Sequence, residues 1–328
     1  MRLGSAVALA LLLTATAVPA TQATSAAQAT TASTTVRLAD LPARAGEREV
    51  RLADPFSMVG LTWSGAPPDQ VEISSLTPSG WGRWTALPAE RGASEPLWTG
   101  RTTSARVRAT RAGADVTGEL ALVALRPDPA PTGALRTDVI KRAEWGADEG
   151  LMKWPPEPTT TKAAIVHHTA GTNDYTCEES AAIVRGIYEF HAVTRGWGDM
   201  GYHVLVDKCG NRFEGRTGGL GGNVVGAHAM GFNRNTFGIA MLGDFSGVAP
   251  PQKMVTAVGE MAGWKLRQAG VPVDGETRLV SEGGENVLFP PGEEATLPTI
   301  FAHRDVAHTA CPGDHGYTNL AAIRHAAI

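Results

Sequence analysis

Residues 162–170 of the 328-residue chain read KAAIVHHTA, and this stretch decides the fold of the C-terminal half. Its apolar run is typical of a strand that is buried on both faces. A helical pattern follows it: Thr176 and Glu179 have the spacing of a capping box, and an apolar stripe runs on from Ile183 to His191. A buried strand followed by an amphipathic helix predicts a mixed α/β domain.

The rest of the C-terminal half repeats this alternation. Strands are predicted at 202–207 (YHVLVD) and 237–242 (FGIAML), and a second helix is predicted within 250–270, after a Pro-Pro pair. Together they predict a mixed β-sheet flanked by helices, over about 190 residues, which is enough for a hydrophobic core. Residues 271–298 form a long insertion, in which we expect a hairpin near the functional cleft.

The N-terminal half has a different pattern. Residues 34–125 contain short alternating runs divided by Pro and Gly, without a helical period. Strands at this spacing predict a smaller all-β, sandwich-like domain, and the proline-rich segment 126–136 is interpreted as the linker between the domains. Its tryptophans are interpreted mainly as core residues, with a sugar-stacking platform as the alternative. They are Trp63, Trp81, Trp84 and Trp98.

The first residues have the pattern of an export signal. Arg2 precedes an apolar stretch at 6–13, and small residues lead to an expected cleavage after Ala20, so that residues 1–20 form the signal peptide. Residues 21–33 are rich in Ala, Thr, Ser and Gln and are predicted to be a disordered tail. No later run reaches the roughly 18 apolar residues of a membrane span. The sequence therefore predicts a secreted protein that does not insert into a membrane.

Composition and charge exclude some partners. The formal net charge is −4 and hydrophobic residues make up 43% of the chain, as in ordinary globular proteins. A chain of this charge is not expected to bind nucleic acid or an anionic membrane surface. A monomer is expected.

The cysteine count is odd, which is unusual for an exported protein. Of Cys177, Cys209 and Cys311, two can pair and one is left over. Metal ligation is one reason to keep such a thiol as thiolate. A buried inert cysteine and an intermolecular bridge are the alternatives, and the count alone does not decide between them.

Histidines gather at two places that also suit a metal. Residues 301–313 read FAHRDVAHTACPG, and the buried strand ends in His167 and His168. Adjacent side chains of a strand point to opposite faces, so at most one of this pair can join a given site. Spacing does not choose that member, nor does it choose between His303 and His308. Two histidines and one thiolate would leave the fourth zinc position to water, as in catalytic zinc sites.

Five blocks of the C-terminal half occur together in a fixed order: VHHTA (166–170), DMGYHVLVD (199–207), VVGAH (224–228), FGIAMLGDF (237–245) and AHRDVAHTACPG (302–313). They resemble the peptidoglycan recognition protein and zinc-dependent N-acetylmuramoyl-L-alanine amidase family. The resemblance covers about residues 137–328, and the β-domain in front of it looks like that of the secreted actinobacterial members.

The resemblance implies a zinc site and its residues. It implies His168, His303 and Cys311 as the metal ligands and Tyr202 as an active-site residue. Members that only bind peptidoglycan typically lack this cysteine, so its presence implies catalysis. Thr309 stands where the phage-type enzymes have a lysine; it is expected to supply a hydroxyl donor at the site, or else to cap local backbone.

Three further residues are expected to contact substrate. The resemblance places His228 in the cleft, and Trp197 is expected to stack on sugar or peptide, with simple packing as the alternative. Arg216 is expected to meet a stem-peptide carboxylate, unless it is an ordinary surface arginine. Cys177 and Cys209 then remain as the disulfide pair.

The implied function is hydrolysis of the amide bond between N-acetylmuramic acid and L-alanine, with peptidoglycan (muramyl peptide) as the partner and zinc as the cofactor. A non-catalytic peptidoglycan-binding protein is the first alternative. A zinc endopeptidase that acts within stem peptides is the second.

Overall fold

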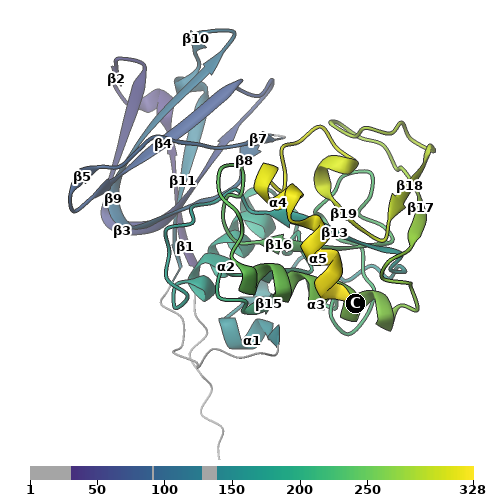
Figure 1. Ribbon diagram of the computed structural model, residues 1–328. Helices are drawn as coiled ribbons and strands as arrows, with labels where there is room; N and C mark the ends of the chain where they lie inside the picture. Colours follow the sequence, from purple (N-terminus) through teal and green to yellow (C-terminus); the bar gives the residue numbers. More distant parts are fainter. Residues whose placement is uncertain (1–30, 91, 128–138) are drawn as a thin grey trace, which may run out of the picture.

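The computed structural model describes residues 31–90, 92–127 and 139–328 (Figure 1). The expected signal peptide, most of the expected tail and most of the expected linker lie outside these ranges. The described chain forms an all-β domain followed by a mixed α/β domain, which confirms the predicted fold class.

The β-domain is built on antiparallel strands in the order β1-β11-β3-β9-β4-β5. Their bounds are β1 Thr31–Arg37, β3 Glu47–Trp63, β4 Gln70–Thr77, β5 Gly80–Trp81, β9 Leu97–Arg111 and β11 Leu120–Pro127. Short strands attach to them: β2 Ala43–Arg44, β6 Thr85–Ala86, β7 Ala89–Glu90, β8 Ala93–Ser94 and β10 Ala114–Asp115.

The first strand differs from the sequence prediction. Thr31 to Ser33 belong to β1 rather than to a tail, because β1 pairs with β11 along its whole length, from Thr31 opposite Pro127 to Arg37 opposite Ala121. The β-branched threonines of this segment favour a strand once a partner strand is available. The Ala-, Thr- and Ser-rich composition of the segment does not indicate this pairing.

The tryptophans of the β-domain divide into two groups. Trp63 and Trp98 are each 8% exposed and pack in hydrophobic clusters, as predicted for core residues. Trp81 and Trp84 instead lie under the guanidinium groups of two arginines of β9, at 3.9 and 4.4 Å from the ring centroids. These two stack on cations of their own domain.

The α/β domain contains a six-stranded mixed sheet in the order β12-β15-β14-β16-β13-β19. The strands are β12 Val139–Ile140, β13 Ala163–His168, β14 Val204–Val206, β15 Arg212–Glu214, β16 Thr236–Met241 and β19 Ile300–Ala302. The predicted buried strand β13 lies between β16 and β19 and is parallel to both. All six of its residues are buried, as its apolar sequence predicts.

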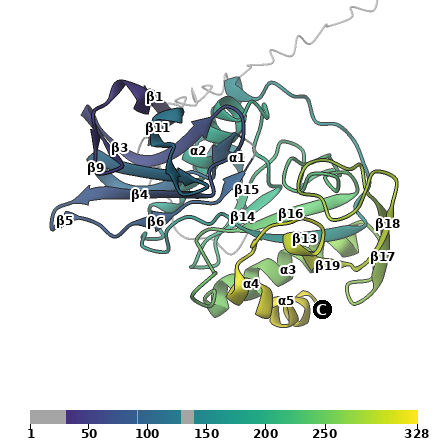
Figure 2. The ribbon, with the colours of Figure 1, turned by 90° about the horizontal axis from the view of Figure 1, so that it is seen from above.

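Helices cover both faces of this sheet (Figure 2). The α-helices are α1 Arg142–Trp145, α2 Ser180–Glu189, α3 Gln252–Gln268, α4 Asp314–Thr318 and α5 Leu320–Ala327. α2 packs on one face and lies toward the β-domain, whereas α3 and α5 pack on the other. The capping prediction holds in part: the Thr176 N–H donates to Glu179 Oε2 at 2.6 Å, but α2 begins only at Ser180, and its N-cap residue, Glu179, makes no side-chain cap bond.

The insertion forms the expected hairpin. β17 (Glu276–Val280) and β18 (Glu294–Pro298) pair antiparallel, and the chain between them reaches the loop that follows β19. There the His308 N–H donates to Asn286 O at 2.7 Å. The insertion therefore lies beside the histidine- and cysteine-rich loop.

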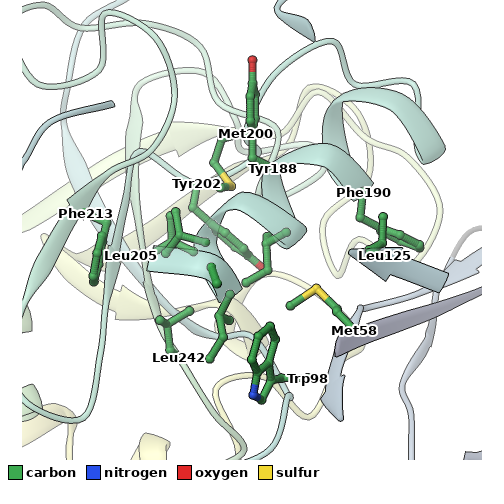
Figure 3. Packing of buried hydrophobic residues seen from close by; sticks show 14 of the residues in the cluster. Met58, Trp98, Leu125, Tyr188, Phe190, Met200, Tyr202, Leu205, Phe213 and Leu242 are labelled. Carbon is green, nitrogen blue, oxygen red and sulfur yellow. The ribbon is translucent and has the colours of Figure 1, made fainter. Parts of the chain in front are cut away.

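The two domains share a hydrophobic cluster (Figure 3). Met58, Trp98 and Leu125 of the β-domain pack in it with residues of α2 and of the turn after it. The fit is close: a Cβ at Gly60 would collide with the ring of Phe190. The β-domain is therefore packed against the segment that leads into the functional site.

Candidate functional site

The site forms at one edge of the mixed sheet. β13 and β19 are parallel neighbours, so their carboxyl ends meet at the same edge. β13 ends in the two adjacent histidines, and β19 leads directly into His303, the first residue of a short 3-10 helix, His303–Asp305. Topology thus joins two histidine clusters that lie far apart in the sequence.

Three potential metal ligands meet at this edge. One ligand atom each from His167, His303 and Cys311 lies within 4.8 Å of the other two. His167 Nδ1 is 3.7 Å from Cys311 Sγ, and the rings of His167 and His303 have centroids 4.6 Å apart. Cys311 is buried and outside any disulfide. Two imidazoles and one thiolate are a donor set that suits zinc and leaves one tetrahedral position open.

His168, which the resemblance implied as a ligand, does not join this group, and His167 takes its place beside His303 and Cys311. Its Nδ1 accepts a hydrogen bond from the Phe245 N–H at 3.2 Å and lies 3.6 Å from Asp244 Oδ1. Strand alternation sends the two neighbouring rings in different directions, and His167 is the one that turns toward His303. The backbone N–H of His168 instead donates to Cys311 Sγ at 3.4 Å.

A second histidine holds the ring of His167. His167 Nε2 lies 3.1 Å from His228 Nδ1, while its Nδ1 faces the thiol. Such a partner fixes the orientation and tautomer of a metal-binding imidazole. Burial, reinforced by neighbouring histidines, holds the pKa of both His167 and His228 well below the usual value, so both are neutral at pH 7. Neutral imidazole is the form that binds a metal.

The expected catalytic side chains lie beside the cluster. The ring of Tyr202 is 5.3 Å from the ring of His167, and the residue is 7% exposed. Thr309 lines the same hollow, but its Oγ1 accepts a hydrogen bond from the Cys311 N–H at 3.2 Å. Thr309 thus caps the backbone of the loop that carries Cys311, as the second of its two expected roles requires.

A cleft runs between the two domains at this point. One hollow of about 440 Å³ contains Tyr202, His303 and Cys311 on one side, and Leu87, Pro88 and Glu95 of the β-domain on the other. A smaller one of about 260 Å³ continues past His303 and Thr309 to the insertion. No local pattern in residues 34–125 predicts that the β-domain forms a wall of this cleft.

Two carboxylates line the larger hollow, and neither was expected there. Glu95 accepts hydrogen bonds from His191 Nε2 at 3.2 Å and from Arg195 Nη2 at 3.1 Å. Asp244 follows β16 and accepts from the Ser246 N–H at 2.9 Å. Asp244 lies within a block that the sequence singled out, whereas Glu95 belongs to the other domain and carried no local signal.

Two of the three residues that were expected to contact substrate line the cleft, and the third is buried elsewhere. His228 and Trp197 line both hollows, and Trp197 packs on the ring of His191 at 4.7 Å. Arg216 is only 6% exposed and donates from Nη1 to Met200 O at 2.9 Å. It supports the loop before Tyr202 and is not among the residues that line the two hollows, so the structure gives the expected contact with a stem-peptide carboxylate no support. His308 is exposed at the rim of the smaller hollow.

The expected disulfide between Cys177 and Cys209 is present, with Cα atoms 6.3 Å apart. It ties the segment before α2 to the turn after β14. Within the described ranges, no helix is long and apolar enough to cross a membrane.

Comparisons with known proteins cover both domains. A family described as N-acetylmuramoyl-L-alanine amidase matches residues 157–314, and one described as Rv3811 N-terminal galactose-binding domain-like matches residues 14–134. Peptidoglycan-recognition protein SC1a of Drosophila melanogaster is 28% identical over 57% of this chain and 86% of its own length.

Two further relatives are similar over parts of the chain. Peptidoglycan recognition protein 3 of Homo sapiens is 38% identical over 33% of this chain and 30% of its own length. The solved structure of Drosophila PGRP-LB is 24% identical, covers 56% of this chain and 92% of its own, and superimposes with a TM-score of 0.44.

Proposed function

The C-terminal domain belongs to the family of peptidoglycan recognition proteins and N-acetylmuramoyl-L-alanine amidases, and on this premise we propose that the protein is a secreted, zinc-dependent amidase. Its substrate would be peptidoglycan, and the bond that it cleaves would join the lactyl group of N-acetylmuramic acid to L-alanine. A role connected with peptidoglycan follows from the family; catalysis, zinc and export are the proposal.

The observation that carries the proposal is the grouping of Cys311 with His167 and His303. A protein that only binds peptidoglycan has no need for a buried thiol that lies outside any disulfide and against two imidazoles. The three residues would hold zinc through two nitrogens and one sulfur, with His167 in place of the expected His168. Bound there, zinc would polarise the amide carbonyl and lower the pKa of its water toward about 7.

The surrounding residues would prepare the site. His228 holds His167 through the hydrogen bond to Nε2, which keeps Nδ1 directed toward the thiol. The Tyr202 hydroxyl would donate to the oxygen that becomes negative as the amide is attacked. Trp197 would offer a flat surface to a sugar ring or to the stem peptide. Each of these side chains is held by packing before substrate arrives.

Digestion of purified cell wall tests the proposal and separates it from both alternatives. The amidase is expected to release peptides with a new N-terminal alanine and to leave free lactyl carboxylates on the glycan. New termini inside the stem peptide would indicate an endopeptidase, and wall that is bound but intact would indicate a recognition protein. A digest with Cys311→Ala protein controls for a contaminating hydrolase.

Export of the full chain can be tested separately. The disulfide supports an oxidising compartment, because such bonds rarely persist in the cytosol. Expression of the full chain in a bacterial host should yield processed protein outside the cytoplasm, with its first residue near the expected cleavage after Ala20. Unprocessed chain retained in the cytoplasm would contradict secretion.

A further inference from the structure

One carboxylate of the β-domain, that of Glu95, contacts the segment after α2 and lines the cleft. Glu95 lies between β8 and β9, and its side chain is 12% exposed. It lines the hollow that also contains Tyr202 and Cys311. Its two oxygens meet two residues of the other domain, His191 Nε2 at 3.2 Å and Arg195 Nη2 at 3.1 Å.

The hydrogen bonds of His191 define its tautomer. His191 is fully buried in the π-helical turn Phe190–Thr194 that follows α2. Its Nδ1 lies 3.2 Å from the Gly201 backbone N–H, which can only donate. Nδ1 is therefore the acceptor and Nε2 carries the proton, which it donates to Glu95. Removal of the carboxylate would leave this tautomer without its partner.

His191 also contacts the loop that carries the proposed catalytic tyrosine. Gly201 directly precedes Tyr202, whose ring is 5.5 Å from the ring of His191. The loop has little freedom to shift, since a Cβ at Gly201 would come within 2.8 Å of Ala227 O and 3.0 Å of the Trp197 ring. A change in the orientation of His191 would therefore be transmitted to Tyr202 and Trp197.

The Glu95 carboxylate is in the ionised form, which suits its role as acceptor of the hydrogen bonds from His191 and Arg195. Burial alone would raise the pKa of Glu95, but the positive charge of Arg195 and the hydrogen bonds from His191 and Arg195 hold this pKa below its usual value. Glu95 is therefore ionised at neutral pH and accepts from both partners. An ionised acceptor gives the stronger hydrogen bond to an imidazole N–H.

We propose that Glu95 is a positioning residue for the amidase reaction: it holds His191 in the Nε2–H tautomer, and His191 in turn positions Tyr202 through Gly201. The β-domain then contributes a positioning residue to the catalytic centre. In an isolated α/β domain, Tyr202 would no longer be held in its position. This inference rests on the proposed amidase function.

Three variants of the full-length, zinc-loaded protein test it. Glu95→Ala removes the acceptor, and Glu95→Gln restores a neutral acceptor oxygen. Glu49→Ala is the matched control, because Glu49 is also a β-domain glutamate paired with two arginines, Arg51 and Arg106, but it does not line the cleft.

The expected kinetic result on a soluble muramyl peptide is specific to positioning. Glu95→Ala should lower kcat by at least about tenfold, with KM and zinc content little changed. Glu95→Gln should recover most of this loss, and Glu49→Ala should match the wild type. Wild-type kcat in Glu95→Ala, or equal loss in Glu95→Ala and Glu95→Gln, would overturn the proposal.

A second readout does not depend on activity. Hydrogen exchange of the Gly201 amide should become at least about tenfold faster in Glu95→Ala, because its acceptor is no longer held. The ¹⁵N signals of the His191 ring should change from a single tautomer to a mixture. Unchanged exchange and an unchanged tautomer would overturn the proposal. If the wild type does not hydrolyse peptidoglycan, the proposed function fails, whereas this measurement still decides the role of Glu95.

Discussion

Two clusters in the α/β domain contain cysteine and bring potential ligand atoms within 4.8 Å of one another, yet their chemistry differs. One consists of Cys177, Asp207 and Cys209, and the other of His167, His303 and Cys311. In the first, the two thiols are joined in a disulfide. In the second, the single thiol lies beside two imidazoles. We call the first the disulfide cluster and the second the histidine cluster.

The surroundings explain the difference. In the disulfide cluster, the Asp207 carboxylate already accepts from the N–H groups of Cys209 and Asn211, both at 2.9 Å, and from Asn211 Nδ2 at 2.7 Å. The Asp207 oxygens therefore stabilise the turn that follows β14. In the histidine cluster, Cys311 and His303 line a cleft. A cysteine thus serves as a cross-link or as a candidate ligand according to its partners.

The largest expected effect is the loss of the thiol from the histidine cluster. Cys311→Ser should reduce hydrolysis of purified cell wall to the background rate, a loss greater than the roughly 10–100-fold seen for outer-shell partners of a metal. The matched change in the disulfide cluster, Cys177→Ser with Cys209→Ser, should leave the rate of the folded enzyme nearly unchanged. If both variants lost activity equally, the distinction between the clusters would fail.

The disulfide cluster should instead show its effect in stability. The two cysteines are 32 residues apart, and opening a loop of this size should lower the free energy of unfolding by about 3–4 kcal/mol. Chemical denaturation of oxidised wild type and of the double serine variant measures this difference. An unchanged midpoint would mean that the bond constrains nothing in the unfolded chain.

The hydroxyl beside the histidine cluster should affect rate without affecting zinc. Tyr202→Phe should lower kcat by about 100-fold, as the loss of one donor to a developing oxyanion does. Tyr175→Phe is the control near the disulfide cluster, because the Tyr175 hydroxyl bonds the backbone of Leu242 and Lys208. It should cost about 1 kcal/mol of stability and little activity. Full activity in Tyr202→Phe would remove this tyrosine from the reaction.

The last expected effect is a dependence of stability on pH, which arises from buried histidines near the site and not from the disulfide cluster. Burial lowers the pKa of His203 to about 3, and its ring bonds Gly238 N–H and Val224 O. The unfolded chain binds this proton near pH 6.5, so stability falls as pH drops from 6.5 toward 3, by up to about 1.4 kcal/mol per pH unit.

Denaturation of the metal-free protein between pH 7 and pH 4 measures this slope. Replacement of His203 with Gln should reduce the slope, whereas His325→Gln, at an exposed position, should not. A slope that His203→Gln leaves unchanged would contradict the assignment.

The fold was predictable where the pattern is local. The apolar run of β13 and the hairpin in the insertion depend on residues close in sequence, and both are present, together with the Glu179 half of the capping box before α2. The strand at Thr31 was missed because its partner, β11, lies almost 90 residues away. Low-complexity composition gives no sign of such a partner.

The site was predictable in part, for the same reason. The clusters around His167 and His303 were evident, but alternation says only that two adjacent side chains diverge. Which of them faces the site depends on where β19 lies in the sheet. Glu95 was not predictable, because its role arises from the packing of one domain on another.

The central claim is that His167, rather than its neighbour, completes the histidine cluster. Zinc per chain, measured by elemental analysis after dialysis of His167→Ala and His168→Ala, tests it most directly. We expect about one zinc per chain in the wild type and in His168→Ala, and close to none in His167→Ala. Zinc retained in His167→Ala and lost from a folded His168→Ala would contradict the account.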